Sequence, residues 1–238
     1  MTALEEVRAC HAAVWQALGT VRDPELDEPL TSLGFVARCA VEDGRASVDL
    51  RLPTYFCAPN FAFLMVADAY DAVSAVPGVA TTEVRLVDHF AAEAINRGVA
   101  ARAGFAASFE GEATGELEEL RATFVRKAVL AGTDRVVRAL LASGVDRARL
   151  ADLTLGEVPA TADRERLRDR RRELGLPCGD GDPLLVDPET GQPVPAGELA
   201  RHLGFARLTR ASQEANSGVC RDMLRVRYPH IGEQEGAR

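Results

Sequence analysis

The sequence predicts an α+β domain over residues 1–90, in the order helix, strand, strand, helix, strand, and a mainly α-helical domain over residues 116–238. Two segments that alternate apolar and polar residues flank an Asp-Gly turn, as in a half-buried hairpin. Apolar residues at helical spacing come before and after this hairpin. The second half shows helical patterns only, and the glycine-rich residues 91–115 between the two parts predict a linker that is helical in places.

The first elements follow from local signals. Residues 4–18 carry an apolar stripe at helical spacing, and Gly19 is a suitable stop. The Asp23-Pro24 pair predicts a turn. A strand is expected to end near Glu42, and a second strand to run from the Asp-Gly turn to Leu52.

Cys57 lies in the loop that joins the second strand to a helix over residues 61–76. Pro53 and Pro59 bracket it and restrict the backbone. Amides at the start of the helix would point toward the sulfur, which tends to lower the pKa of a thiol, and the thiolate is the form that attacks or binds metals. The alternative is a buried, inert cysteine. Pro77-Gly78 breaks the helix, and residues 79–87 alternate as a third strand.

Composition narrows the classes of function. The 238 residues carry a formal net charge of -8, which argues against a dedicated nucleic-acid binder or an anionic membrane surface as partner. No run has the length of a transmembrane helix, and the N-terminus lacks the features of a signal peptide, so a cytoplasmic protein is expected. Five scattered cysteines without a CxxC pair indicate reduced thiols.

Four segments together resemble the family of iron–sulfur assembly proteins that includes SufT and PaaD. The similarity covers roughly residues 4 to 90 and is carried by Val21–Leu26, Ser32–Val36, Pro53–Cys57 with Pro59, and Pro77–Val79. The resemblance implies the α+β fold of that family, often dimeric, and a role in maturing iron–sulfur or other metalloproteins. It also implies Asp23, Pro24 and Glu25 as a signature turn, and Cys57 as a reactive or metal-binding thiol.

The chain departs from the family at Ser32, at Tyr55-Phe56 and in the unusually aromatic stretch from Asn60 to Phe63. Ser32 replaces the usual acidic residue, and the bulky Tyr55-Phe56 pair replaces a short approach to the cysteine. These changes suggest a specialised client protein. Since similar proteins with a long C-terminal extension are encoded beside soluble diiron monooxygenases, the resemblance implies such an enzyme as client. The cargo would be iron or an iron–sulfur cluster, bound transiently.

Further candidate residues surround this loop. His89, at the end of the third strand, is a candidate second metal ligand, although a lone histidine is more often a surface or hydrogen-bonded residue. Tyr55, Phe56 and Phe61 are candidates for an exposed patch that docks a client, the alternative being burial in the core. The acidic residues of the signature turn could bind metal, but an Asp-Pro turn more often uses its Asp to hold the loop.

The second half resembles no family. Helices are expected over residues 116–143 and 162–174, with a Pro/Gly/Asp-rich loop at 177–195 and two final helices at 198–203 and 208–227. The last two, joined at Gly204, allow a helix-turn-helix DNA-binding regulator as an alternative. The acidic net charge favours an ordinary helical hairpin.

We therefore expect a maturation factor rather than an enzyme, acting as a homodimer on a client metalloenzyme. One alternative is a metal-free folding chaperone or adaptor for the same client. Another is an enzyme with Cys57 as nucleophile, but the sequence supplies no base or orienting group for it. No nucleotide-binding or standard hydrolase motif is present.

Overall fold

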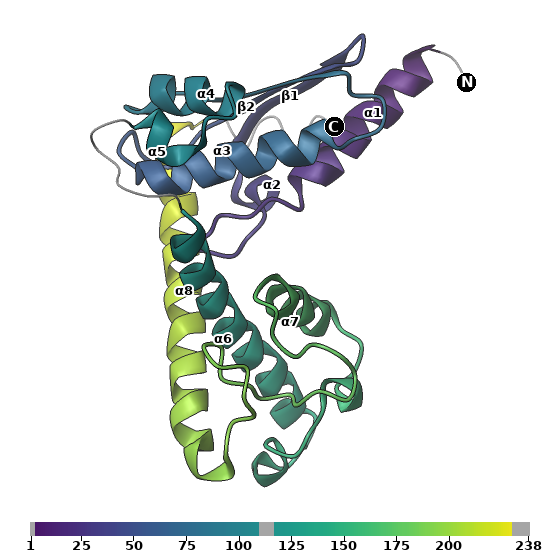
Figure 1. Ribbon diagram of the computed structural model, residues 1–238, viewed down its shortest axis with the longest axis vertical. Coiled ribbons are helices and arrows are strands. Elements are labelled where there is room, and N and C mark those ends of the chain that lie inside the picture. Colours follow the sequence, from purple (N-terminus) through teal and green to yellow (C-terminus); the bar gives the residue numbers. More distant parts are fainter. Residues whose placement is uncertain (1–2, 110–116, 230–238) are drawn as a thin grey trace. The chain divides into compact units, whose positions relative to one another are not determined.

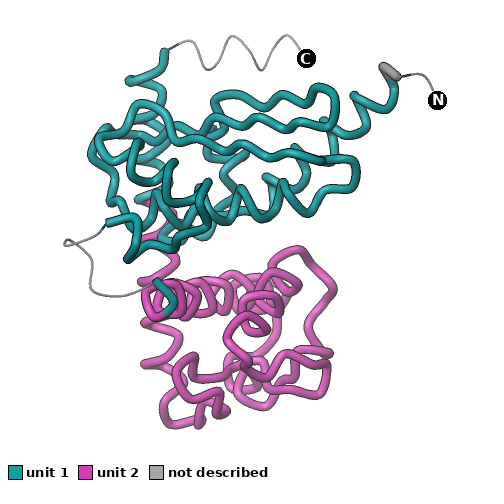
Figure 2. The backbone as a smooth tube through the Cα atoms, turned by 45° about the horizontal axis from the view of Figure 1, so that its top comes forward, with its two compact units in different colours: residues 1–118, 216–238 teal, residues 119–215 magenta. Residues whose placement is uncertain are grey.

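The computed structural model describes residues 3–109 and 117–229 (Figure 1). The chain divides into two compact units (Figure 2). Unit 1 comprises residues 1–118 and 216–238, and unit 2 comprises residues 119–215. This division differs from the predicted one, which placed all of residues 116–238 in a single helical domain. Residues 110–115 of the predicted linker lie outside the described residues.

Unit 1 contains a three-stranded sheet in the order β1-β2-β3. β1 (Val36–Glu42) pairs antiparallel with β2 (Arg45–Leu50), and β3 (Thr81–Leu86) pairs parallel with β2. Asp43 and Gly44 form the hairpin turn with φ of 48° and 74°, the left-handed geometry that the twist of a two-residue hairpin needs. The predicted antiparallel hairpin and the third strand are confirmed; the parallel pairing of β3 with β2 was not predicted.

Helices cover this sheet. α1 (Ala3–Leu18) packs on β1 and on α3 (Pro59–Ser74), which in turn contacts β3 (Figure 1). Together with the sheet they confirm the predicted α+β domain. The short α2 (Leu30–Leu33) was not predicted; it ends at Gly34, whose φ of 75° is the usual left-handed stop of a helix.

Two helices occupy most of the described part of the predicted linker. α4 (Ala92–Ala100) packs against β3 and α3, and α5 (Gly104–Ser108) packs against α4. Ile95 of α4 is fully buried in the core of unit 1. A Cβ at Gly98 would lie 1.8 Å from the Ser108 hydroxyl oxygen, so this close packing requires a glycine.

Unit 1 is completed by the C-terminal part of α8 (Leu199–Arg227). Leu224 is 2% exposed and belongs to the same apolar core as the sheet. A Cβ at Gly34 would lie 3.3 Å from Leu224 Cδ2, so glycine also leaves room for this side chain. The N-terminal domain therefore takes part of its core from residues far away in the sequence.

Unit 2 is built from α6 (Glu118–Ala142), α7 (Ala162–Glu173) and the first part of α8. Three short 3-10 helices join them: η1 (Arg147–Arg149), η2 (Leu155–Glu157) and η3 (Ala196–Glu198). Arg171 is fully buried and donates to the carbonyl oxygens of Pro177, Pro183 and Leu184. The irregular 177–195 segment is thus fixed to α7 by Arg171, and Arg168 of α7 also pairs with Asp180.

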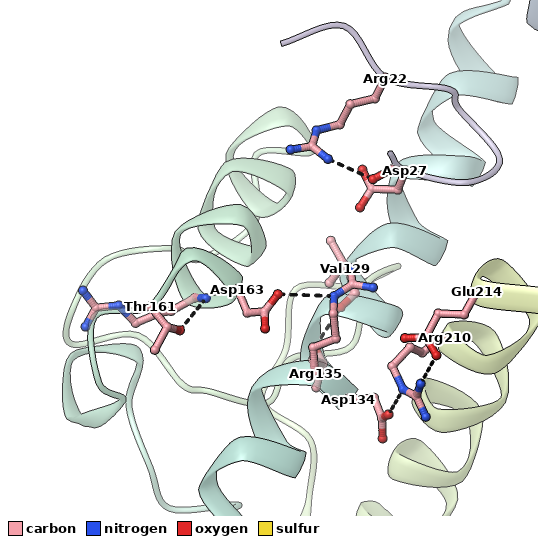
Figure 3. A network of polar contacts seen from close by, with 11 residues as sticks. Arg22, Asp27, Val129, Asp134, Arg135, Thr161, Asp163, Arg210 and Glu214 are labelled. Atoms are coloured by element: carbon pink, nitrogen blue, oxygen red, sulfur yellow. Dashed lines mark hydrogen bonds and ion pairs between the residues drawn. The ribbon is translucent and has the colours of Figure 1, made fainter. Parts of the chain in front are cut away.

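The prediction of two final helices is wrong, because α8 runs unbroken through Gly204. In the part of α8 that belongs to unit 2, the Arg210 guanidinium donates to Asp134 of α6 at 2.5 Å and to Glu214 one turn further along α8 (Figure 3). A helix-turn-helix needs a turn at this place, so the DNA-binding alternative loses its structural basis. Among the described residues, no helix is long and apolar enough to cross a membrane.

Candidate functional site

Cys57 lies in the loop between β2 and α3, with its side chain half-buried. Its Sγ is 3.3 Å from the Thr54 hydroxyl, which also accepts the Phe56 N–H at 3.2 Å. α3 starts immediately after this loop, with Pro59 in its first turn and no side-chain cap from Ala58. Cys57 therefore lies in a strand-to-helix loop, two residues before the start of α3, as the sequence predicts.

His89 holds the Cys57 loop from the side of β3. Its Nε2 is 2.8 Å from the Cys57 carbonyl oxygen, and its Nδ1 accepts the Ala91 N–H at 3.2 Å. Since Nδ1 accepts, the proton sits on Nε2 and is donated to Cys57. Burial lowers the pKa of His89, and Arg227 adds to this, against the effect of the Cys57 carbonyl. The sequence suggests His89 as a second metal ligand beside Cys57. In the structure, both of its ring nitrogens form hydrogen bonds with backbone groups.

The signature turn is held by Asp23, which is 8% exposed. Its Oδ1 accepts the N–H groups of Glu25 and Leu26 at 2.9 and 2.8 Å. Burial raises the pKa of Asp23 to about 6; these two hydrogen bonds oppose the rise, and the charges of Glu25 and Glu28 add to it. The contacts match the loop-holding role that an Asp-Pro turn favours.

The C-terminal part of α8 binds the segment that follows this turn. Glu28 accepts the Ser217 hydroxyl at 2.6 Å and forms an ion pair with Arg221. Asn216 lies 3.4 Å from the Glu25 carboxylate. Three residues within about one and a half turns of one helix, Asn216, Ser217 and Arg221, thus hold the turn region.

The end of α8 also joins the two loops that carry Cys57 and His89. Arg227 donates to the carbonyl oxygens of Leu52 at 3.1 Å and of Asp88 at 2.6 Å. The Tyr228 hydroxyl donates to the Asp88 carboxylate at 2.7 Å. Asp88 has a φ of 54°, so these contacts fix a backbone conformation that few residues other than glycine adopt.

Cys220 of α8 is half-buried against the same core as Cys57. Burial raises the pKa of its thiol to about 11, and the charges of Asp23, Cys57 and Glu25 add to this effect. No motif in the sequence connects Cys220 with Cys57. In the sequence, only its helical spacing from Ser217 and Leu224 could have indicated that Cys220 also faces unit 1.

An exposed aromatic cluster covers the Cys57 loop and consists of Tyr55, Phe56 and Phe90. Phe56 is 75% exposed, and its ring centroid lies 5.0 Å from that of Tyr55 and 5.9 Å from that of Phe90. The Phe90 N–H donates to the Tyr55 carbonyl at 3.2 Å. Phe61, the third aromatic residue named from the sequence, is instead part-buried against the core, while Phe90 was missed.

The site is sparse in metal ligands. Within residues 3–109 and 117–229, no three His, Cys, Asp or Glu side chains are grouped so that they could hold a metal ion. Cys57 and Cys220 both keep free thiols. Any cargo at this site would need ligands in addition to those of the described chain.

Residues 11–86 match the model of a family described as iron–sulfur cluster assembly protein. The matched stretch begins within α1, includes the signature turn, the Cys57 loop and α3, and ends with β3. The loop that carries His89 and Phe90, the helices of unit 2 and all of α8 lie outside it. A comparison with curated proteins finds no match.

Proposed function

Residues 11–86 form an iron–sulfur cluster assembly domain, and from this premise we propose that the chain helps to assemble or insert an iron or iron–sulfur centre into a client metalloenzyme. The observation that carries this proposal is the family match together with a cysteine in the loop between β2 and α3. The domain family supports a general role in iron–sulfur cluster assembly. The client and the form of the cargo are parts of the proposal.

In the proposed mechanism, the Cys57 thiolate binds iron or a cluster and passes it on by ligand exchange. Thiolate is the ligand that iron–sulfur centres use, and one thiolate cannot fill a four-coordinate site. The remaining ligands would come from the client or from a second copy of the chain in a homodimer. A site with few ligands of its own suits transfer, since each ligand kept by the donor slows release.

The client would dock on the aromatic cluster beside Cys57. Tyr55, Phe56 and Phe90 expose large rings on one surface, and such rings dominate the energetics of protein interfaces. A soluble diiron monooxygenase is the specific client we propose, on the basis of the resemblance that includes the long C-terminal extension. The exposed cluster equally favours the second candidate function, a metal-free chaperone or adaptor that works through docking alone.

Replacement of Cys57 by Ser separates the two functions. The exchange is nearly isosteric in a loop, so the fold should persist, while maturation of the client should be lost in cells that lack the wild-type gene. Cys10→Ser and Cys39→Ser are the controls, since both side chains pack against the core. They should cost about 1 kcal/mol of stability and keep maturation. If the Cys57→Ser chain matures its client normally, the docking-only function takes precedence.

The mass of the protein in solution tests the proposed homodimer. Light scattering at micromolar concentration, with and without ferrous iron, should give twice the mass of one chain. A strict monomer in both conditions would remove ligands shared between two copies and leave the client as their source.

A further inference from the structure

We propose that a cavity of unit 2 binds a small organic anion, which presents a phosphate or carboxylate group to arginine side chains and an apolar body to the cavity wall. The inference is independent of the proposed function and concerns the helical part of the chain, which lies outside the family match. The cavity has a volume of about 370 Å³ and lies among α6, η1 and α8. Its lining includes four arginines: Arg138, Arg147, Arg207 and Arg210.

Three of these guanidinium groups have no partner in the described part of the chain. Arg138, Arg147 and Arg207 are exposed, and their side chains form no hydrogen bond or ion pair with the described residues. They belong to α6, η1 and α8 in turn, so they reach the cavity from three separate elements. Elsewhere in unit 2, Arg126 and Arg168 each pair with a carboxylate. The cavity thus collects unpaired positive charge in a chain whose net charge is -8.

The carboxylate in the lining, that of Asp134, is already paired. It accepts from Arg210, which is 9% exposed and also donates to Glu214 (Figure 3). The lining as a whole keeps a net charge of +3, from four arginines and one aspartate. Guanidinium groups bind phosphate and carboxylate through paired N–H groups, so this charge favours an oxyanion as ligand.

Apolar residues complete the lining and indicate what else the anion carries. Val137 and Leu203 are buried, Leu141 is half-buried, and all three line the cavity. Gly204 keeps the wall open, since a Cβ there would meet nothing within 4 Å. Small-molecule sites span roughly 300–1,000 Å³, and this cavity lies near the lower limit. A ligand with one apolar ring or short chain and one charged group fits such a space.

This arrangement favours a small ligand over a nucleic acid. Proteins that bind a duplex present a basic face along its phosphates and place a helix or strand in a groove. In unit 2, the unpaired guanidinium groups instead share one cavity with apolar side chains, and the chain as a whole is acidic.

Two anionic probes with the same apolar ring, phenyl phosphate and benzoate, separate the two head groups, and phenol is the neutral control. Ligand-observed NMR would follow each titration with the full-length protein. At least one anionic probe should bind with a Kd below about 1 mM, more weakly as salt is raised, and phenol should not bind. The tighter probe identifies the head group. Binding of neither anion, or equal binding of phenol, would overturn the inference, and a DNA duplex that binds instead would assign the arginines to a nucleic-acid surface.

Arginine variants locate the bound anion. Arg147→Gln and Arg207→Gln should each weaken the tighter probe about tenfold, the loss expected for a hydrogen bond between charged groups. Arg149→Gln is the control within η1, and Arg201→Gln is the control within α8, where Arg201 pairs with Glu198. Neither control residue lines the cavity, so both variants should bind as wild type. Equal weakening by a variant and its control would indicate attraction by overall charge and overturn the inference.

A further variant tests the cavity without removing a charge. Gly204→Met extends a side chain from the open wall and raises the helix propensity of α8, so the fold should persist, as circular dichroism would show. It should weaken the tighter probe at least about tenfold, the loss expected when one charged hydrogen bond is blocked. Gly197→Met is the control, because a Cβ at Gly197 also meets nothing within 4 Å but the residue does not line the cavity. Wild-type affinity in Gly204→Met would place the anion outside the cavity and contradict the inference.

Discussion

His89 donates its Nε2–H to the carbonyl oxygen of Cys57 across 2.8 Å. Its other ring nitrogen accepts the Ala91 N–H, so one imidazole links the end of β3 to the loop that carries the thiol. The His89 imidazole thus holds the backbone of Cys57.

His89→Ala should loosen the Cys57 loop. The change leaves the Cys57 carbonyl and the Ala91 N–H without their partner, at an expected cost of about 1–3 kcal/mol. Amide exchange by mass spectrometry should quicken in residues 54–58, and denaturant unfolding followed by Trp15 fluorescence should report the loss. His89→Asn, which can still accept from Ala91, should lie between the alanine variant and wild type. Unchanged exchange in the loop would contradict the positioning role.

Asp23→Asn should make unit 1 more stable at neutral pH. The pKa of Asp23 rises on folding from 3.8 to about 6, so the native state binds more protons between these values. Stability from this group is therefore present below pH 4 and lost as pH rises through 6. Asn keeps the Oδ1 acceptor and should gain about 1–3 kcal/mol over wild type at pH 7.5, and nothing at pH 4.

Urea unfolding of both chains across this pH range would measure that difference. Burial lowers the pKa of His89, and a base with a lowered pKa gives the opposite slope: stability falls as pH drops below about 6.5. His89 is present in both proteins, so its effect cancels in the difference in unfolding free energy between Asp23→Asn and wild type. An equal gain at all pH values would show that the carboxylate charge is not its source.

Arg227→Ala should affect the Cys57 loop, whereas Arg225→Ala should not. Arg227 binds the carbonyls of Leu52 and Asp88, while Arg225 is exposed and pairs only with Asp222 on the same helix among the described residues. We expect a loss of about 1–3 kcal/mol for the first and within about 0.5 kcal/mol for the second. Hydrogen exchange in the loops around Leu52 and Asp88 would locate the effect.

Leu224→Ala should destabilise the N-terminal domain, although the residue lies far outside the family match. Removing a fully buried leucine costs about 2–5 kcal/mol. The loss should appear in the unfolding of Trp15, the one tryptophan, which lies in α1. Met223→Ala, at a largely exposed neighbouring position, should leave the transition within about 0.5 kcal/mol. An unchanged Trp15 transition for Leu224→Ala would mean that α8 is not part of that core.

Arg171→Met should unfold unit 2 selectively. Burial lowers the pKa of Arg171 only to about 10, so the guanidinium stays charged at neutral pH and serves the carbonyls of Pro177, Pro183 and Leu184. Leaving three carbonyls unpaired should cost about 3–5 kcal/mol. Arg172→Met, at an exposed pair with Asp169, is the control. Circular dichroism should show an earlier helical transition while Trp15 fluorescence is unchanged.

The sheet and its flanking helices were predictable because their signals are local. Asp43-Gly44 specifies a two-residue hairpin turn, and the alternation on each side fixes which residues face the core. Pro77-Gly78 likewise ends the preceding helix, and the alternation after it marks the third strand. None of these signals depends on a distant part of the chain.

The C-terminal region was predicted less well because its signals are weak or distant. Gly204 suggested a break, but it is exposed and a glycine inside a helix costs only about 1 kcal/mol, which the long α8 tolerates. The burial of Leu224 under Gly34 depends on contacts across most of the sequence. Spacing within α8 gives no indication of what its apolar face covers.

The site was predicted in part for the same reason. The signature turn and the Cys57 loop are continuous motifs, and the structure places them in one unit. Phe90 joins the aromatic cluster only because the backbone after β3 lies beside that of Tyr55. The hydrogen bonds of His89 to the Cys57 and Ala91 backbone are equally invisible in a linear sequence.

The split origin of unit 1 has a consequence for the order of events on the ribosome. The first 118 residues emerge well before residues 216–228, and all of unit 2 is synthesised in between. Until α8 leaves the exit tunnel, the nascent assembly domain lacks Leu224 in its core and Arg227 at its loops. The Cys57 site therefore reaches its final structure last. A chain that stops before α8 carries a Cys57 loop without the contacts of Arg227 and a core without Leu224.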